Sequence, residues 1–384
     1  MGNGRTILKE NKKELHHDHL DETVLYEIFT RLPQECLAEL RYACKTFHKW
    51  TSWSKFVADS FHLSRPALLV QVPGNLRSKA FKTRFLELDS EGLGFKNKKF
   101  GMSKMGKARS TCNGLLLVND TNKEKCLVVM NVLTKCYVAI PFCPSHCKHE
   151  ACGLALVFNP HDKVYKVVHV YNAGFGFEIF TLGCSGNEWK VIPGPFSGPG
   201  EQPFGAQFRW SDPLSTNGQL ILHWDVDSRE YIISFDTSEE TFRRTCYPCR
   251  FEEGTGTLLE TGGNLSFAHR SSSTQFDVWV LEDFERQVWN KSYSVLAESI
   301  SYTSQEINAL PSFENLVPLF SLRDGEIMLF RHKSSPCWYL FEKKLRVLKK
   351  LSGMPVKTTP KLLLYKSSLV RWKNKEELLV RETI

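Results

Sequence analysis

The sequence predicts a mainly β protein, a β-propeller preceded by a small module of three helices. Between residues 20 and 56, apolar residues recur at the spacing of one helix face. From about residue 67 onward, short β-branched and aromatic segments bounded by Gly, Asn, Asp and Pro follow one another in a recurring order. We therefore expect a disordered leader at residues 1–17, the helical module at 18–64, a linker with the first strands at 65–110 and the propeller at 111–384.

The helical module is predicted from three apolar stripes. The first is bounded by Asp21 and Glu22, which suit a helix N-terminus, and by Pro33, which ends the helix or begins the next. The stripes are Val24, Leu25, Ile28, Phe29 and Leu32, then Cys36, Leu37, Leu40, Ala43, Cys44 and Phe47, and finally Trp50, Trp53 and Phe56. Three such short helices bury little apolar surface by themselves, so we expect a partner to cover part of it.

The propeller is predicted from five strand units that open alike. The openings read CNGLLLV, CGLALVFNP, NGQLILHW, GGNLSFAH and DGEIMLF and begin at residues 112, 152, 217, 262 and 324. Their spacing is irregular but lies near the ~50-residue period of some propeller blades, and the longer gaps leave room for a further blade or long loops. A β-sandwich is the alternative, since degenerate strand repeats with tight turns read similarly.

The helical module resembles an F-box. The residues in register with that pattern are Leu20, Glu22, Val24, Leu25, Glu27, Ile28, Arg31, Leu32, Pro33, Leu37, Leu40, Arg41, Cys44, Lys45, Phe47, Trp50 and Phe56. Asp21 stands where the pattern has proline and Ala43 where it has valine, yet the apolar stripe is kept. An ordinary helical hairpin that packs on its own domain is the alternative.

The strand-rich part resembles the F-box-associated, kelch-like propeller domain of plant F-box proteins. The opening Thr111–Leu115 matches that domain, and so do Asn159 and Pro160 followed by a Tyr-Lys-Val-Val strand from Tyr165. Further matches are Ser234, Phe235, Asp236, Thr241, Phe242, Asp277, Val278, Trp279, Val288 and Trp289. The paired glycines and tryptophan of stricter kelch repeats are mostly missing, which leaves the number of blades open.

These resemblances imply a substrate-recognition subunit of an SCF-type ubiquitin ligase. The F-box would bind a Skp-type adaptor, and through it cullin and RING subunits, while the propeller would bind a target protein through loops not yet identified. The chain would have no catalytic residues. The expected adaptor-binding residues are Leu20, Leu25, Ile28, Leu32, Pro33, Leu37 and Leu40. The alternatives are a scaffold outside any ligase, and a propeller enzyme or glycan-binding protein with an incidental helical leader.

Other chemistry is sparse in the sequence. The segment CPSHCKHEAC offers candidate zinc ligands, Cys143, His146, Cys147, His149 and Cys152, and the pair Cys246 and Cys249 can complete a site if the fold brings the loops together. One short loop rarely supplies four ligands, so we expect ordinary thiols and no cofactor. The GxSxG, GxxxxGK[ST] and HExxH motifs do not occur, nor does GxGxxG between a strand and a helix, so no catalytic residue is nominated.

Charge and hydropathy limit the partners. The net charge is +8, but the clustered lysines and arginines carry no groove-reading or base-stacking motif, so we expect a solvated basic face and no nucleic acid. No apolar run approaches the ~20 residues of a transmembrane segment, and the charged start lacks a signal-peptide core. We therefore expect an intracellular protein of the nucleus or cytoplasm. Gly2 and Thr6 fit a myristoylation pattern, although a leader that merely begins with glycine is the preferred interpretation.

Overall fold

The computed structural model describes residues 21–371 apart from 75–79, 90–93, 101–103, 120–125, 151, 172–175, 184–187, 197–209, 217–219, 227, 253, 303–311, 352–353 and 355–359. The predicted leader, Gly2 and Leu20 therefore lie outside the described residues. Within them, no helix is long and apolar enough to cross a membrane.

The helical module contains four helices where the sequence analysis expected three. They are α1 (Glu22–Thr30), α2 (Gln34–Leu40), α3 (Lys45–Trp50) and α4 (Ser54–Leu63). Asp21 caps α1 by accepting a hydrogen bond from the Thr23 amide at 3.1 Å. The second predicted apolar stripe is divided between α2 and α3. The reason is that Cys44 adopts an extended backbone conformation, with φ −158°, which interrupts the helical residues.

Tyr26 on α1 ties the module together. Its hydroxyl donates to Asp59 Oδ2 on α4 at 2.7 Å, and its ring makes edge contacts with Trp50, Trp53 and Phe56. Leu37, Trp50 and Phe56 form the buried centre of the module. The three apolar stripes therefore do converge on one small core.

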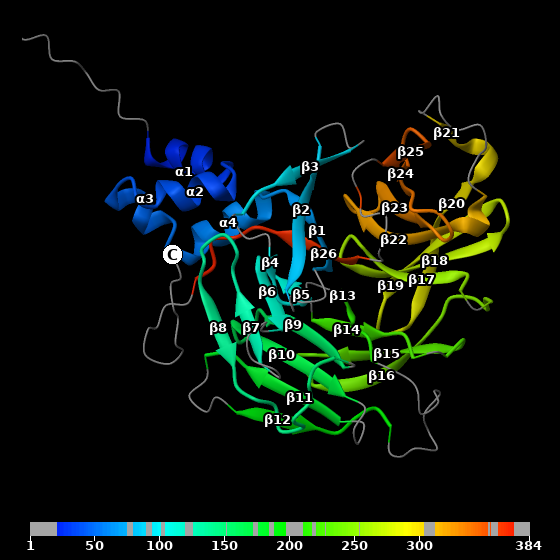
Figure 1. Ribbon diagram of the computed structural model, residues 1–384, viewed down its shortest axis with the longest axis horizontal. Helices are drawn as coiled ribbons and strands as arrows, with labels where there is room; N and C mark the ends of the chain where they lie inside the picture. Colours follow the sequence, from blue (N-terminus) through cyan, green and yellow to red (C-terminus); the bar gives the residue numbers. More distant parts are fainter. Residues whose placement is uncertain are drawn as a thin grey trace, which may run out of the picture.

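Five consecutive sheets follow the order of the five predicted strand units (Figure 1). The first comprises β5 (Ala108–Cys112), β6 (Leu115–Asn119), β7 (Leu127–Met130) and β8 (Tyr137–Ile140), and the second comprises β9 (Gly153–Asn159), β10 (Val164–Tyr171), β11 (Gly176–Thr181) and β12 (Trp189–Ile192). The third comprises β13 (Leu214–Thr216), β14 (Ile221–Trp224), β15 (Tyr231–Asp236) and β16 (Thr241–Cys246), and the fourth comprises β17 (Gly256–Thr261), β18 (Asn264–Ser272), β19 (Gln275–Asp283) and β20 (Val288–Leu296). The fifth comprises β22 (Leu316–Leu322), β23 (Ile327–His332), β24 (Trp338–Glu342) and β25 (Val347–Leu351), with β21 (Ser301–Tyr302) beside β25.

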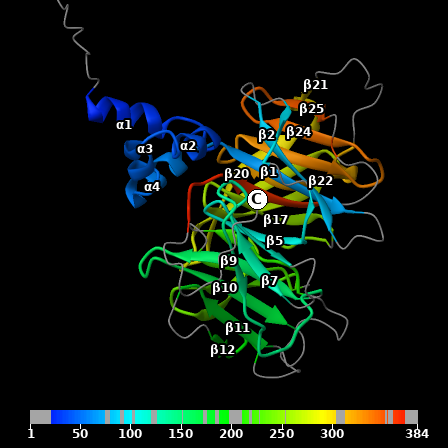
Figure 2. The same ribbon diagram turned by 60° about the vertical axis from the view of Figure 1, so that its left-hand side comes forward.

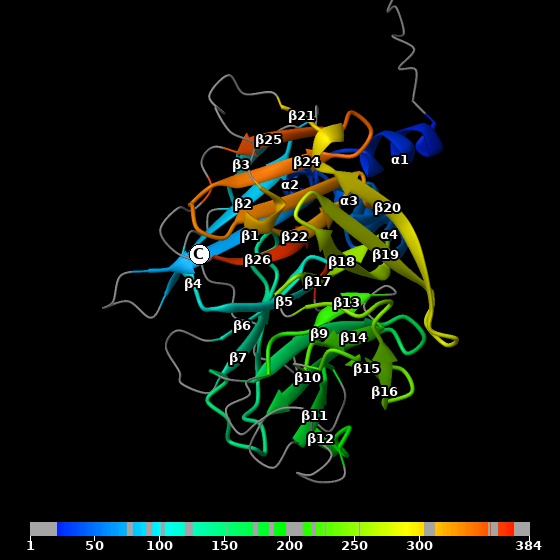
Figure 3. The ribbon, with the colours of Figure 1, turned by 90° about the vertical axis from the view of Figure 1, so that its right-hand side faces the viewer.

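The sixth sheet joins the two ends of the propeller chain. It contains β26 (Lys361–Lys366), β1 (Pro66–Pro73), β2 (Phe81–Leu88) and β3 (Phe95–Lys98), with β4 (Lys104–Met105) beside β2. Figure 3 shows red β26 running beside blue β1, and the two strands pair antiparallel from Pro66 opposite Lys366. The propeller thus begins at β1, whereas the sequence analysis began it at residue 111 and treated residues 65–110 as a linker with first strands.

Shared apolar clusters close the six blades into a ring. Buried residues of the sixth and first sheets pack together, as do those of the first and second, and of the second and third. The third and fourth sheets, the fourth and fifth, and the fifth and sixth share further clusters. Every blade therefore buries both faces against its neighbours, which confirms the propeller and rules out the sandwich.

Candidate functional site

The described adaptor candidates divide into exposed and internal residues. Ile28 is 47% exposed, and Pro33 is also exposed at the start of α2. Leu25, Leu32 and Leu40 are half-buried and pack on the module's own core, and Leu37 is 1% exposed within it. Ile28 and Pro33 can therefore contact a partner directly, whereas the other four shape the helices that carry them.

Four more large apolar side chains of the module are exposed: Val24, Tyr42, Trp53 and Leu63, which is 54% exposed at the end of α4. Val24 is 44% exposed one helical turn before Ile28, so the two lie on the same face of α1. Trp53 is 47% exposed at the start of α4, and Tyr42 is 77% exposed in the turn between α2 and α3. The sequence analysis missed Tyr42 because it stands outside the apolar stripes.

The module is attached directly to the sixth blade (Figure 2). Glu35 on α2 forms an ion pair with Lys98 on β3, with Lys98 Nζ 3.0 Å from Oε1, and the same oxygen accepts from Ser367 Oγ at 3.1 Å. Lys366 at the end of β26 donates to the His62 carbonyl at 2.9 Å. Leu369, which follows β26, is 3% exposed within the module core. The helices and the propeller therefore share one core and one polar interface.

The opposite end of β26 contacts a buried charge network. Lys361 Nζ lies 2.7 Å from Asp212 Oδ2, and Arg109 Nη2 lies 2.7 Å from Asp212 Oδ1. Burial alone would raise the pKa of Asp212, but Arg109 and Lys361 hold that pKa below its usual value. Since a six-residue strand is about 17 Å long, this network and the helical module lie at opposite ends of β26.

Arg109 also holds the loop between β8 and β9. Its guanidinium donates to the carbonyl oxygens of His149 and Cys152, each at 2.5 Å, and only 2% of the arginine is exposed. The loop is thus fastened where it carries most of the candidate zinc ligands. Arg109 belongs to the clustered basic residues for which the sequence suggested a solvated face, and its burial was not foreseen because its partner Asp212 is far away in the chain.

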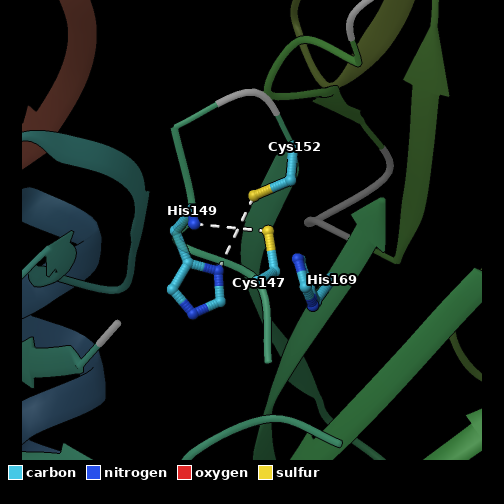
Figure 4. A group of neighbouring side chains, drawn as sticks. All are labelled: Cys147, His149, Cys152 and His169. Carbon is cyan, nitrogen blue, oxygen red and sulfur yellow. Dashed lines mark hydrogen bonds between the residues drawn. The ribbon is translucent and has the colours of Figure 1, made fainter. Parts of the chain in front are cut away.

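The structure brings three of the loop candidates together with a residue from another element (Figure 4). One ligand atom each from Cys147, His149, Cys152 and His169 lies within 4.8 Å of all the others. His169 belongs to β10, which pairs with β9 so that His169 lies opposite Leu154. We call these four residues the Cys2His2 cluster. Three of its members are buried and Cys147 is half-buried.

The remaining candidate ligands lie outside this cluster. Cys143 is grouped instead with His169 and Glu178, and His146 is exposed. Cys246 is exposed on β16, and Cys249 Sγ is 3.9 Å from His269 Nδ1 in a different blade. Among the described residues, the CxxC pair therefore does not join the loop candidates.

The groups in and around the cluster shift one another's pKa in opposite directions: the hydrogen bond between the two thiols lowers the pKa of Cys147 and, together with burial, raises the pKa of Cys152. Burial would lower the pKa of His169, but the thiols of Cys143 and Cys147 and the carboxylate of Glu178 raise that pKa to about 10. Burial likewise would raise the pKa of Cys143, while the neighbouring side chains of His149, His169 and Ser145 lower it to about 6.

Comparison with known proteins is consistent with this architecture. Residues 81–341 match the family model described as the F-box associated beta propeller domain. The chain is 24% identical to the F-box protein At3g07870 of Arabidopsis thaliana over 72% of its own length and 73% of the relative's. It is 23% identical to the F-box/LRR-repeat/kelch-repeat protein At2g27520 of the same plant, over 71% and 76% of the two lengths. The chain therefore belongs to the family of proteins with an F-box associated beta propeller domain.

Proposed function

We propose that this protein is the substrate-recognition subunit of an SCF-type ubiquitin ligase. The exposed residues Val24, Ile28 and Pro33 would bind a Skp-type adaptor, and the adaptor would connect the chain to cullin and RING subunits. The observation that carries the proposal is an exposed apolar helix face on a module that is fastened to a family propeller. Apolar anchors of this kind dominate the affinity of protein interfaces.

In this role the chain contributes position and performs no chemistry. A target held by the propeller is brought close to a charged ubiquitin-conjugating enzyme, which raises the effective concentration of the target's lysines. Gains of this kind need a defined distance between the two binding surfaces. The shared core around Leu369 and the Glu35 contacts supply such a connection, since they join the helices to the blade without an intervening linker.

The propeller surface available to a target is the one opposite the helices. The module occupies the end of the ring where β26 finishes, at Lys366, whereas Lys361, Arg109 and the loop between β8 and β9 lie at the other end. We therefore propose that target proteins bind the loops described at that end, among them the β8–β9 loop, and that the protein acts inside the cell, in the nucleus or the cytoplasm.

Copurification with a Skp-type adaptor tests the proposal. Ile28→Asp places a charge on the exposed face of α1 and should abolish recovery of the adaptor, because a charge cannot be buried there without a partner. Val191→Asp, at a side chain 58% exposed on β12, is the matched control and should bind as the unchanged chain does. Failure of the unchanged chain to bind any Skp-type adaptor, or equal binding by Ile28→Asp, would contradict the proposal.

A further inference from the structure

We propose that Cys147, His149, Cys152 and His169 bind one zinc ion, which fixes the loop between β8 and β9 on the propeller face opposite the helices. The four residues all belong to the propeller, so the inference does not depend on adaptor binding. It rests on the positions of the four donor atoms, on a buried imidazole nitrogen that has no hydrogen-bond partner among the described residues, and on the groups that surround the two histidines.

The four donor atoms already lie close to one another. Tetrahedral zinc with Zn–S of about 2.3 Å and Zn–N of about 2.0 Å separates its ligand atoms by roughly 3.3–3.8 Å. Cys152 Sγ lies 3.7 Å from His149 Nδ1, within that range, and no pair of the four atoms is more than 4.8 Å apart. Movements of about 1 Å, as side-chain rotations allow, complete the tetrahedron.

His169 Nε2 is the second observation that points to a ligand. The residue is 0% exposed, and its Nδ1 lies 3.0 Å from Glu178 Oε2. Nε2 has no hydrogen-bond partner among the residues that the structure describes. A buried nitrogen left unpaired is costly, and zinc would satisfy it. A carboxylate on one nitrogen and a metal on the other is the usual arrangement of a zinc-binding histidine.

His149 also directs one ring nitrogen to the zinc ligands and the other to a neighbouring group. Its Nδ1 faces Cys152, while its Nε2 lies 3.8 Å from Cys143 Sγ. Cys143 in turn accepts a hydrogen bond from Ser145 Oγ at 3.2 Å. With zinc on Nδ1, Nε2–H donates to the Cys143 sulfur, so we assign Cys143 an orienting role next to the site and not a place among the ligands.

The backbone holds the loop in a conformation that suits this site. His149 has a φ of 56°, a left-handed conformation that is uncommon for a residue with a side chain. The two carbonyl oxygens that accept hydrogen bonds from Arg109 belong to His149 and Cys152, so the backbone of two ligand residues is held in place. Gly153 comes next, and a Cβ there would lie only 2.4 Å from the Ser211 carbonyl oxygen, so the chain can follow this path only with glycine.

Donor chemistry and charge favour zinc. Two thiolates and two imidazoles form one of the usual closed, four-coordinate zinc sites. Binding releases one proton from each cysteine that is still a thiol and one from each histidine that is protonated, so that both imidazoles bind in the neutral form. The two thiolate charges then neutralise Zn²⁺, so the buried centre carries no net charge of its own.

Metal analysis of the full-length chain, purified without added metal or chelator, tests the assignment. We expect about one zinc per chain, as a closed four-ligand site holds. Cys147→Ser and His169→Gln should lose it, while Cys246→Ser, at an exposed thiol in another blade, should keep it. A chain free of stoichiometric zinc that also fails to take up Zn²⁺, or full zinc in Cys147→Ser and His169→Gln, would overturn the proposal.

Two measurements on the unchanged chain remain decisive if those variants do not fold. After removal of zinc by a chelator, Co²⁺ should produce the visible absorption of a tetrahedral site together with a thiolate charge-transfer band. Chelation should also make two additional thiols reactive, which peptide mapping should identify as Cys147 and Cys152. Absence of the cobalt bands, or a disulfide between these two cysteines in protein isolated from cells, would contradict a zinc site.

Discussion

His223 is a buried imidazole in the third blade, and its hydrogen-bond partners within the described residues are hydroxyl groups. Nε2 lies 2.8 Å from Thr216 Oγ1 and Nδ1 lies 2.7 Å from Ser234 Oγ. Ser234 Oγ is in turn 2.7 Å from Thr245 Oγ1. A neutral imidazole can satisfy this chain with one donor and one acceptor, and burial lowers the pKa of His223 to about 3.

We expect His223 to make the free energy of unfolding depend on pH. In the unfolded chain His223 takes up a proton below about pH 6.5, whereas in the folded chain it does not. His223 therefore leaves the free energy of unfolding at its full value above pH 6.5 and decreases it steadily as the pH falls toward 3. At pH 5.5 the loss is about 1.4 kcal/mol. Urea unfolding should give the free energy of unfolding at pH 7.5 and at pH 5.5. The difference between the two values should be smaller in His223→Gln than in the unchanged chain, by about 1.4 kcal/mol.

The control for this prediction is His161→Gln, since the His161 side chain is 94% exposed. This variant should keep the pH dependence of the unchanged chain. An unchanged pH dependence in His223→Gln would mean that His223 is protonated in the folded protein or that other groups dominate.

At the residue scale, the sequence offered three members of the Cys2His2 cluster as zinc candidates, although it favoured ordinary thiols, and it missed the fourth member, His169. Cys147, His149 and Cys152 stand out because they share one short loop. His169 lies within the strand KVYKVVHVY, where a histidine among valines reads as an ordinary core residue. Only the pairing of β10 with β9 brings it to the loop, and pairing register is a property of the fold that no local pattern displays.

The helices show the same limit at the scale of elements. Apolar periodicity located all of the helical segments, yet it joined α2 to α3 because no glycine or proline marks the turn between them. The turn ends at Cys44, whose extended backbone the apolar pattern does not reveal. The contact of the module with Leu369 was also invisible, since it joins residues more than 300 positions apart.

Leu369 should control the stability of the helical module. Replacing a buried leucine by alanine costs about 2–5 kcal/mol, because it removes apolar contacts and leaves a cavity. Since Leu369 packs among Leu37, Trp50 and Phe56, Leu369→Ala should raise the amide hydrogen-exchange rates of α2 to α4 by at least about thirtyfold. Exchange in β9 to β12 should remain as in the unchanged chain.

The matched control is Leu345→Ala, at a leucine 64% exposed in the turn between β24 and β25. It should leave exchange in the helices unaltered. Equal protection of the helices in Leu369→Ala and the unchanged chain would show that the module is stable without its contact to the propeller.

At the scale of the whole molecule, the sequence predicted the blades made of continuous chain and left their number open. Five blades use consecutive strands, so their openings recur along the sequence. The sixth combines β26 with β1, β2 and β3, which lie at the two ends of the domain, and a search for repeats cannot detect a unit divided in this way. This division also closes the ring, because β26 contacts β5 of the first blade.

The sixth blade connects the proposed adaptor-binding surface with the proposed target-binding surface. One end of β26 contacts α4 through Lys366, and the other contacts the Arg109 and Asp212 network that holds the β8–β9 loop. A target bound at those loops is therefore held at a fixed distance from the adaptor surface. A receptor subunit requires such a connection, whereas a scaffold that binds the adaptor alone does not.

Recruitment to cullin is the measurement that tests the central claim most directly. Purified full-length chain is mixed with a cullin and RING complex, with and without a Skp-type adaptor, and the complex is isolated by size exclusion. We expect the chain to elute with cullin only when the adaptor is present, and we expect Ile28→Asp to elute alone. A chain that binds the adaptor but never elutes with cullin, or that binds cullin without the adaptor, would contradict a role as substrate-recognition subunit.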